Sequence, residues 1–271
     1  MVVQHNMQAV NTNRMLGQNV KAVQKSTEKL SSGYAVNRAG DDAAGLSISE
    51  KMRNQIRGLN QSVKNAEDGI SLIQTAEGNM NEIHSILQRM GELAIKSRND
   101  VNATEDRRSI NDEVVQLKAE ISAITTKAEF NGTKLLNGDM SKGKLLQVGA
   151  NMGETMAISI KGTSLSNLGL TDASVSTGLK ASKAIGQIQS AIKNVSAQRS
   201  LLGAVQNRLE YTINNLENYS ENLTSAESNI RDTDMATEMV NYSKNNILQQ
   251  AAQSMLAQAN QSNQGVLSLL Q

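Results

Sequence analysis

Two apolar series with heptad spacing dominate this sequence. Between Ile188 and Ile230 an apolar residue stands at every seventh position, and a second such series runs from Met52 to Ala94. Each covers about 43 residues, which corresponds to about 65 Å of continuous helix. One helix cannot bury so narrow a stripe by itself, so the two segments are expected to pack against each other. The predicted seam of this rod consists of Met52, Leu59, Ile73, Met80, Leu87, Leu202, Leu209, Leu216, Leu223 and Ile230.

Composition agrees with thin helix-on-helix packing rather than a thick core. Aromatic residues make up only 2% of the chain, and proline, the strongest helix breaker, is absent. Cysteine is also absent and the net charge is +1, so neither a disulfide, a thiolate ligand nor a basic nucleic-acid stripe is expected. No segment approaches the roughly 18 apolar residues of a membrane span. The first residues also lack the pattern of a cleaved secretory signal, so we expect a soluble chain with neither nucleic acid nor membrane as partner.

The order of the segments predicts a nested architecture. A first helix ends at Gly33, and the sequence Ser47–Glu50 fits a capping box at the start of the long helix. A third helix has its seam between Ile110 and Ala128, and Gly-rich alternation over about 131–178 predicts a β-hairpin. The long helix from near Lys180 is followed by a last helix. The predicted class is mainly α: an elongated antiparallel coiled-coil or helical-bundle rod with a small β-hairpin region.

This order also predicts two domains. Residues 1–42 and 232–271 would form one discontinuous terminal-helix domain, and residues 43–231 the rod domain with its β region. The terminal helices carry apolar residues at helical spacing, and the segment from Asn245 to Gln271 has no charged residue. Uncharged amides among Ala, Leu and Met favour a helix enclosed by other protein in a polymer, while a low-charge frayed tail is the alternative. The predicted polymerisation residues are Val2, Ala9, Leu16, Val23, Leu30, Leu248, Ala252, Met255, Ala259, Val266 and Leu269.

Motifs for chemistry are weak. The two histidines, His5 and His84, lie on different predicted helices, and no zinc-binding or nucleophile-elbow pattern is present. The segment Gly138–Leu145 nearly matches a phosphate-binding loop, but Leu145 stands where Ser or Thr should bind magnesium. We therefore interpret it as a Gly-rich turn before a strand. The sequence predicts no catalytic site, no metal, no cofactor and no enzymatic activity.

Seven segments spread over nearly the whole chain carry a resemblance to known proteins: Glu28–Gly33, Asn37–Leu46, Asn65–Gly78, Glu129–Leu136, Val148–Asn151, Leu202–Arg208 and Val266–Leu270. These segments closely resemble bacterial flagellins. The resemblance implies that the terminal helices form an inner tube and that the longer helices and the β part surround it. Only Gly162 to about Gly178 separates the β part from the descending helix. The chain therefore looks like a minimal flagellin without inserted outer domains.

Function follows from the resemblance as an expectation. It implies self-assembly into the extracellular flagellar filament for motility, after export through the flagellar type III apparatus without a cleaved signal peptide. Implied partners are copies of the chain, an export chaperone, the filament cap, the hook-junction proteins and Toll-like receptor 5. The receptor motif appears at Gln88–Ile95, and Arg89, Leu93 and Glu113 match the family's receptor-binding positions. A hook–filament junction protein and a coiled-coil signalling module are the alternatives.

Overall fold

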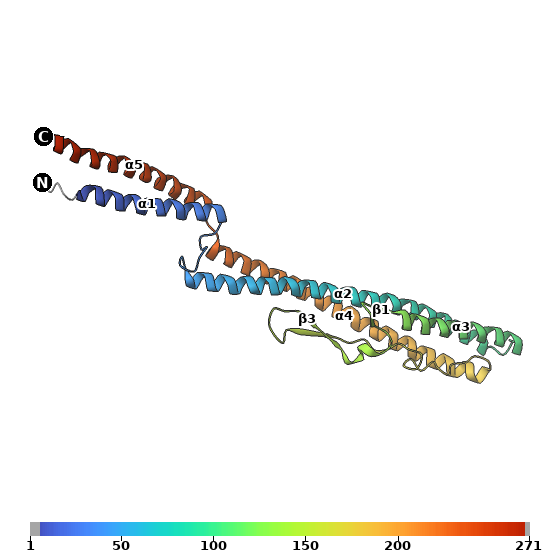
Figure 1. The fold of residues 1–271 in the computed structure, drawn as a ribbon. Helices are drawn as coiled ribbons and strands as arrows, with labels where there is room; N and C mark the ends of the chain where they lie inside the picture. The colour runs from blue at the N-terminus through green and yellow to red at the C-terminus, as the bar shows by residue number, and fades with distance from the viewer. Residues whose placement is uncertain (1–5, 269–271) are drawn as a thin grey trace. The chain divides into compact units, whose positions relative to one another are not determined.

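The computed structural model describes residues 6–268, and their side chains through Ser262. Five α-helices account for most of these residues: α1 (Met7–Ser32), α2 (Ala43–Arg98), α3 (Thr104–Lys127), α4 (Gly178–Arg231) and α5 (Met235–Ser268). The chain divides into two compact units, one of residues 55–221 and one of residues 1–54 with 222–271. Figure 1 shows the order of these elements along the chain. Within the described residues no helix is long and apolar enough to cross a membrane.

The unit of residues 55–221 is built on a regular heptad seam along α2. From Leu59 to Ser97 the buried positions of α2 alternate in steps of three and four residues, as knobs-into-holes packing requires. The predicted series supplies Leu59, Ile73, Met80 and Leu87, which are at most 3% exposed. Small or polar residues fill several intervening seam positions: Ser62, Gly69, Ala76 and Ser97. The seam therefore carries apolar residues at one of its two heptad positions, and small residues at most places of the other position.

Helices α3 and α4 cover this seam. Leu202 and Leu209 of α4 are fully buried and belong to the same core as α2, as do Ile110 and Ile121 of α3. The methyl group Cγ2 of Ile188 on α4 lies 3.7 Å from the position that a Cβ at Gly91 would occupy. The three helices thus form one bundle, in which the side chains of α2 face both neighbours.

Two antiparallel strand pairs follow α3. Strands β1 (Glu129–Phe130) and β2 (Thr133–Lys134) meet at a turn in which Asn131 and Gly132 both have positive φ, 47° and 74°. Strands β3 (Lys144–Gln147) and β4 (Thr155–Ile158) form the predicted hairpin around Asn151–Glu154. A short 3-10 helix, η1 (Asp139–Lys142), precedes β3. The β region therefore contains two small pairs rather than the single hairpin that the alternation predicts.

The inward face of β3 does not carry Leu145. The Leu145 side chain is 73% exposed. Leu146 packs on the core instead, because it pairs with Met156 of β4 and the two share one face of the hairpin. A Cβ at Gly69 of α2 would lie 2.6 Å from Cδ2 of Leu146. Gly69 therefore lets the hairpin approach the helix closely.

In the other unit, two connections run beside each other. The Ala35 N–H donates to the Arg231 carbonyl at 2.7 Å, and the Thr233 N–H donates to the Gly33 carbonyl at 2.9 Å. The guanidinium of Arg231 lies 4.7 Å from the centre of the Tyr34 ring. These contacts tie the α1–α2 connection to the α4–α5 connection.

The long helix α2 begins earlier than predicted. The capping box at Ser47–Glu50 was wrong, since α2 already starts at Ala43. The Asp42 carboxylate accepts hydrogen bonds from the N–H groups of Ala44 and Gly45 at 3.1 and 3.0 Å, and so caps the helix. The neighbouring Asp41 binds Lys25 at 2.8 Å. This bond, together with the Arg38 N–H, lowers the pKa of the Asp41 carboxyl to about 2.

Candidate assembly interface

The terminal helices α1 and α5 form an antiparallel pair (Figure 1). The Asn6 side chain donates to the Ala259 carbonyl at 3.0 Å, and the Asn19 side chain donates to the Leu248 carbonyl at 3.3 Å. Asn6 precedes Asn19 in the chain, whereas its partner Ala259 follows Leu248, the partner of Asn19, so the two helices point in opposite directions. Side-chain amides, rather than apolar interdigitation, thus fix part of the register.

The seam between these two helices is unusually polar. On α1 it consists of Ala9, Thr12, Leu16, Asn19, Val23, Ser26 and Leu30, and on α5 of Glu238, Tyr242, Asn245, Gln249, Ala252, Leu256 and Ala259. Only Ser26 and Ala259 among them are fully buried, each 4% exposed. Polar residues occupy about half of these positions and most of the side chains are only half-buried, so the pair gains limited hydrophobic stabilisation on its own.

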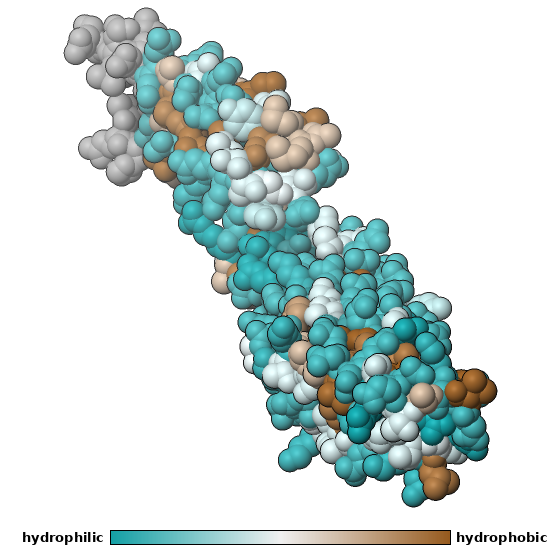
Figure 2. Space-filling model, turned by 90° about the vertical axis from the view of Figure 1, so that its right-hand side faces the viewer, coloured by the Kyte–Doolittle hydropathy of each residue, from teal (hydrophilic) through white to brown (hydrophobic). Residues whose placement is uncertain are grey.

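Large apolar side chains lie outside this seam instead. On α5 the side chains of Val240, Ile247, Leu248 and Met255 are between 42% and 68% exposed. Their spacing, with Ala251 among them, follows one helical face, distinct from the face that packs on α1. We call these five residues the α5 outer stripe. Figure 2 shows brown, hydrophobic side chains on the surface near the grey chain ends.

α1 also exposes apolar side chains. Met7, Val10 and Met15 are 71%, 63% and 49% exposed, respectively. Single exposed apolar residues are common on protein surfaces. A group of neighbouring exposed apolar residues, in contrast, is typical of an interaction surface. The lack of charge on α5 after Lys244 fits such a surface, because a charged side chain would be costly to bury there.

The predicted polymerisation residues fall on both faces of the pair. Ala9, Leu16, Val23 and Leu30 lie half-buried in the seam, as does Ala252, while Ala259 is buried in it. Leu248 and Met255 lie on the outer stripe, so the single apolar series read along α5 is divided between two faces. Val2 and Leu269 lie outside the described residues. Val266 lies within α5, and its side chain is not described.

The remaining seam residues differ between the two units. Leu216 is 8% exposed in the unit of residues 55–221, where the seam is otherwise fully buried. Met52, Leu223 and Ile230 lie in the other unit and are half-buried. The long helices α2 and α4 thus bury their apolar stripes less completely toward this unit.

The predicted receptor residues occupy adjacent positions on α2 and α3. Arg89 forms ion pairs with Glu113 of α3 at 2.9 Å and with Glu92 at 3.1 Å. These two carboxylates raise the pKa of Arg89 above its ordinary value. The Arg89 and Glu113 side chains are about half exposed, whereas Leu93 is 2% exposed and packs in the core. Arg89 and Glu113 are therefore accessible to a partner, and Leu93 is not.

Other chemistry has little structural support. Among the described residues no group of three His, Cys, Asp or Glu side chains is placed to hold a metal ion. The segment Gly138–Leu145 contains η1 and the start of β3, as expected for a turn before a strand. The outer stripe was missed by sequence reasoning, although the spacing of Val240, Ile247 and Ala251 could have indicated a second apolar face.

The protein is thus mainly helical, and its terminal helices α1 and α5 expose an apolar surface. Its sequence is similar to those of known proteins along most of its length. Residues 3–141 match the family model for the bacterial flagellin N-terminal helical region, and residues 185–270 match that for the bacterial flagellin C-terminal helical region. The flagellin of Halalkalibacterium halodurans is 53% identical over 272 residues, and that of Bacillus subtilis 48% identical over 305 residues, each alignment covering all of both chains. The crystal structure of Bacillus cereus flagellin superposes with a TM-score of 0.52 at 30% identity, covering 56% of this chain and 88% of that one.

The chain belongs to the bacterial flagellin family. It is a structural subunit of the flagellar filament, in the short form without an inserted outer domain. Full-length identity to flagellins disfavours both the hook-junction and the signalling-module alternatives.

Proposed function

We propose that the chain polymerises through α1 and α5, and that the α5 outer stripe is the surface that becomes buried. The observation that carries this proposal is the exposure of Val240, Ile247 and Met255 on a helix that has no charge beyond Lys244. Each such side chain contributes about 1.5–3 kcal/mol when it moves from full exposure to burial. Neighbouring subunits therefore supply the hydrophobic stabilisation that the polar α1–α5 seam lacks.

The proposed contact is heterologous, which means that one surface of a subunit packs against a different surface of its neighbour. Such contacts that do not close into a ring generate an open helical filament. We assign residues 1–42 and 232–271 to the inner tube of this filament and residues 43–231 to the surrounding layer. The amide-rich face of α5 would then form a weakly adhesive wall of the channel.

Further partners are proposed on family grounds. Such a subunit requires an export chaperone and passage through the flagellar type III apparatus to leave the cell, and a filament cap and hook-junction proteins at the filament. We propose a structural role without catalysis, because the chain would act in the filament through the contact surfaces that it repeats in every subunit.

Seeded assembly tests the proposal. Purified monomer with short filament seeds should elongate into long tubes that negative-stain electron microscopy resolves. A variant lacking Asn245–Gln271 should remain monomeric under the same conditions, because it lacks most of the outer stripe and the helix that carries it. Circular dichroism of the variant checks that the rest of the chain stays helical. Elongation of this variant at the rate of the full chain would overturn the proposal.

We also propose that Arg89 and Glu113 form part of a surface recognised by Toll-like receptor 5. The ion pair at 2.9 Å supports it, because it holds a half-exposed cation and anion from two helices in one place. Replacing Arg89 with Glu should reduce receptor activation by monomer in a reporter-cell assay at least tenfold. Arg108→Glu, at an exposed arginine of α3, serves as the control. Equal activation by Arg89→Glu and the full-length parent protein would refute the assignment.

A further inference from the structure

Methionine carries all the sulfur atoms of this chain. The sequence contains twelve methionines, and neither cysteine nor tryptophan. A peroxide therefore finds its most reactive side chains at the methionine thioethers, and oxidation to the sulfoxide turns an apolar side chain into a polar one. The positions of the methionines thus decide which contacts such an oxidation can change.

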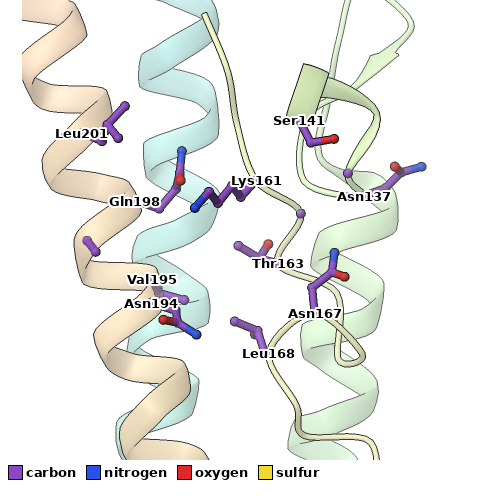
Figure 3. Close-up of a pocket in the computed structure, with 13 residues that line it drawn as sticks. Asn137, Ser141, Lys161, Thr163, Asn167, Leu168, Asn194, Val195, Gln198 and Leu201 are labelled. Carbon is purple, nitrogen blue, oxygen red and sulfur yellow. The ribbon is translucent and has the colours of Figure 1, made fainter. Parts of the chain in front are cut away.

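In the unit of residues 55–221 most methionine side chains are protected. Four of them are buried: Met80, Met90, Met140 and Met156. Met152, at the turn between β3 and β4, is fully exposed. A cavity of about 700 Å³ beside α4 does not open to Met140, because its lining includes the neighbouring Ser141 of η1 but not Met140 itself (Figure 3). The core of this unit is therefore shielded from a dissolved oxidant.

On the terminal helices every methionine side chain is exposed. Met7 and Met15 of α1 and Met235, Met239 and Met255 of α5 are each between 48% and 71% exposed. These helices form the candidate assembly interface, and the flexible methionine side chain is well suited to such a packing surface. Oxidation of the monomer would thus fall mainly on the helices through which we propose that it assembles.

Two methionines of α5 have the same exposure but occupy different faces. Met255 is 53% exposed and belongs to the α5 outer stripe, whereas Met239 is 50% exposed and does not. They are sixteen positions apart in the sequence, which places their side chains about 160° apart around a helix of 3.6 residues per turn. Met239 therefore points away from the stripe and provides a control of the same chemistry on the same helix.

The stripe around Met255 is a poor environment for a sulfoxide. Leu248 and Ala251, which precede Met255 on the stripe, have no hydrogen-bond donor in their side chains. The hydroxyl of the adjacent Ser254 already donates to the Gln250 carbonyl at 3.1 Å. The exposed Gln258 amide lies one turn further along α5, but pairing with it would still place an additional oxygen atom in a surface that buries apolar side chains.

We propose that Met255 is an oxidation site whose sulfoxide keeps a subunit out of the filament. This inference rests on the proposed burial of the α5 outer stripe. The thioether sulfur attacks one oxygen of hydrogen peroxide, so that an S–O bond forms and the O–O bond breaks. The departing hydroxide takes the proton of the transferred hydroxyl and leaves as water; the sulfur is oxidised by two electrons and the peroxide is reduced. Only unassembled subunits expose Met255 to this reaction, so oxidation acts before incorporation.

Mass spectrometry of peptides after a fixed peroxide dose tests the protection of Met255. Met255 should form the sulfoxide about tenfold more slowly in filaments than in the monomer, since oxidation follows exposure. In the monomer Met152 should oxidise readily, and Met80 and Met90 should resist oxidation in both states. Equal oxidation of Met255 in filaments and monomer would overturn the proposal.

Seeded elongation of oxidised full-length monomer tests the consequence. Peroxide treatment should raise the critical concentration of the parent protein about tenfold or more, which corresponds to 1.4 kcal/mol or more. Met255→Leu removes the sulfur but keeps an apolar side chain, so the same treatment should raise its critical concentration less than about threefold. Met239→Leu should lose elongation as the parent does. Without peroxide both variants should elongate normally. A loss in treated Met255→Leu equal to that of the parent would contradict the assignment.

Reversal and a peroxide-free variant complete the test. Methionine sulfoxide reductases A and B with dithiothreitol should restore elongation of the oxidised parent, because together they reduce both sulfoxide epimers. Met255→Gln introduces a polar group without peroxide and should raise the critical concentration about tenfold, whereas Met239→Gln should stay within about threefold. Circular dichroism checks that the variants remain helical. Normal elongation of Met255→Gln, or no recovery after reduction, would overturn the proposal.

A charged substitution on the stripe separates this inference from the proposed function. Ile247→Asp tests burial of the outer stripe without any oxidation. If Ile247→Asp blocks elongation while the oxidised parent elongates normally, the stripe is buried and only the oxidation site is wrong. If Ile247→Asp elongates normally, the stripe is not buried in the filament, and the proposed function and this inference fail together.

Discussion

Replacing Ile247 with aspartate should abolish filament elongation and leave the monomer folded. The Ile247 side chain is 65% exposed in the isolated chain, so the substitution removes few contacts there. In the proposed filament the same position is enclosed by neighbouring subunits, and an aspartate would have to be buried without a partner or stay protonated. Either cost is several kcal/mol, and each 1.4 kcal/mol raises the critical concentration tenfold. We expect an increase of more than a hundredfold, measured by pelleting after addition of seeds.

Two matched variants separate burial from charge. Gln250→Asp adds the same charge three residues away, off the outer stripe, where the exposed side-chain amide donates to the Asn246 side chain. It should lower elongation far less than Ile247→Asp. Ile247→Leu keeps an apolar side chain and should elongate within a few-fold of the parent protein. If Ile247→Asp polymerises normally, the outer stripe is not buried in the filament. If Gln250→Asp is equally defective, net charge on α5 and not the stripe controls assembly.

The helices of this chain were largely predictable because their heptad spacing is a property of the sequence alone. The heptad positions from Leu59 to Leu87 are buried, since an apolar stripe of period seven packs along one side of a neighbouring helix. The stop at Gly33 was equally clear, because a residue with φ of 77° at a helix end favours glycine. The β-hairpin also emerged from alternation, although its inward face on β3 did not.

What the sequence left open depends on contacts between distant segments. Asn131 and Gly132 have the positive φ values of a tight hairpin turn, but the short strands around them carry no alternation, so this strand pair was not predicted. The division of α5 into a polar seam and an outer stripe depends on which face meets α1.

Replacing Leu202 with alanine should destabilise the unit of residues 55–221 by about 3 kcal/mol, within the range of 2–5 kcal/mol for buried leucines. Leu202 is fully buried, and its removal leaves a cavity between α4 and the core that rigid helices cannot close. The adjacent Leu201 is 48% exposed and offers a control of identical chemistry. Leu201→Ala should change the free energy of unfolding by about 0.5 kcal/mol or less, as expected for a surface position.

Urea unfolding of the monomer, followed by circular dichroism, measures both variants. The unit that contains α1 and α5 has a polar seam and should unfold at lower urea concentration, so the transition at higher concentration is the one that Leu202→Ala must shift. The outer stripe lies in the other unit, and therefore Leu202→Ala should still elongate seeds at temperatures where it remains folded. A similar loss of stability in Leu201→Ala and Leu202→Ala would mean that the heptad seam does not form the core. If Leu202→Ala instead lost elongation while remaining stable, the long helices rather than α5 would carry the assembly contact.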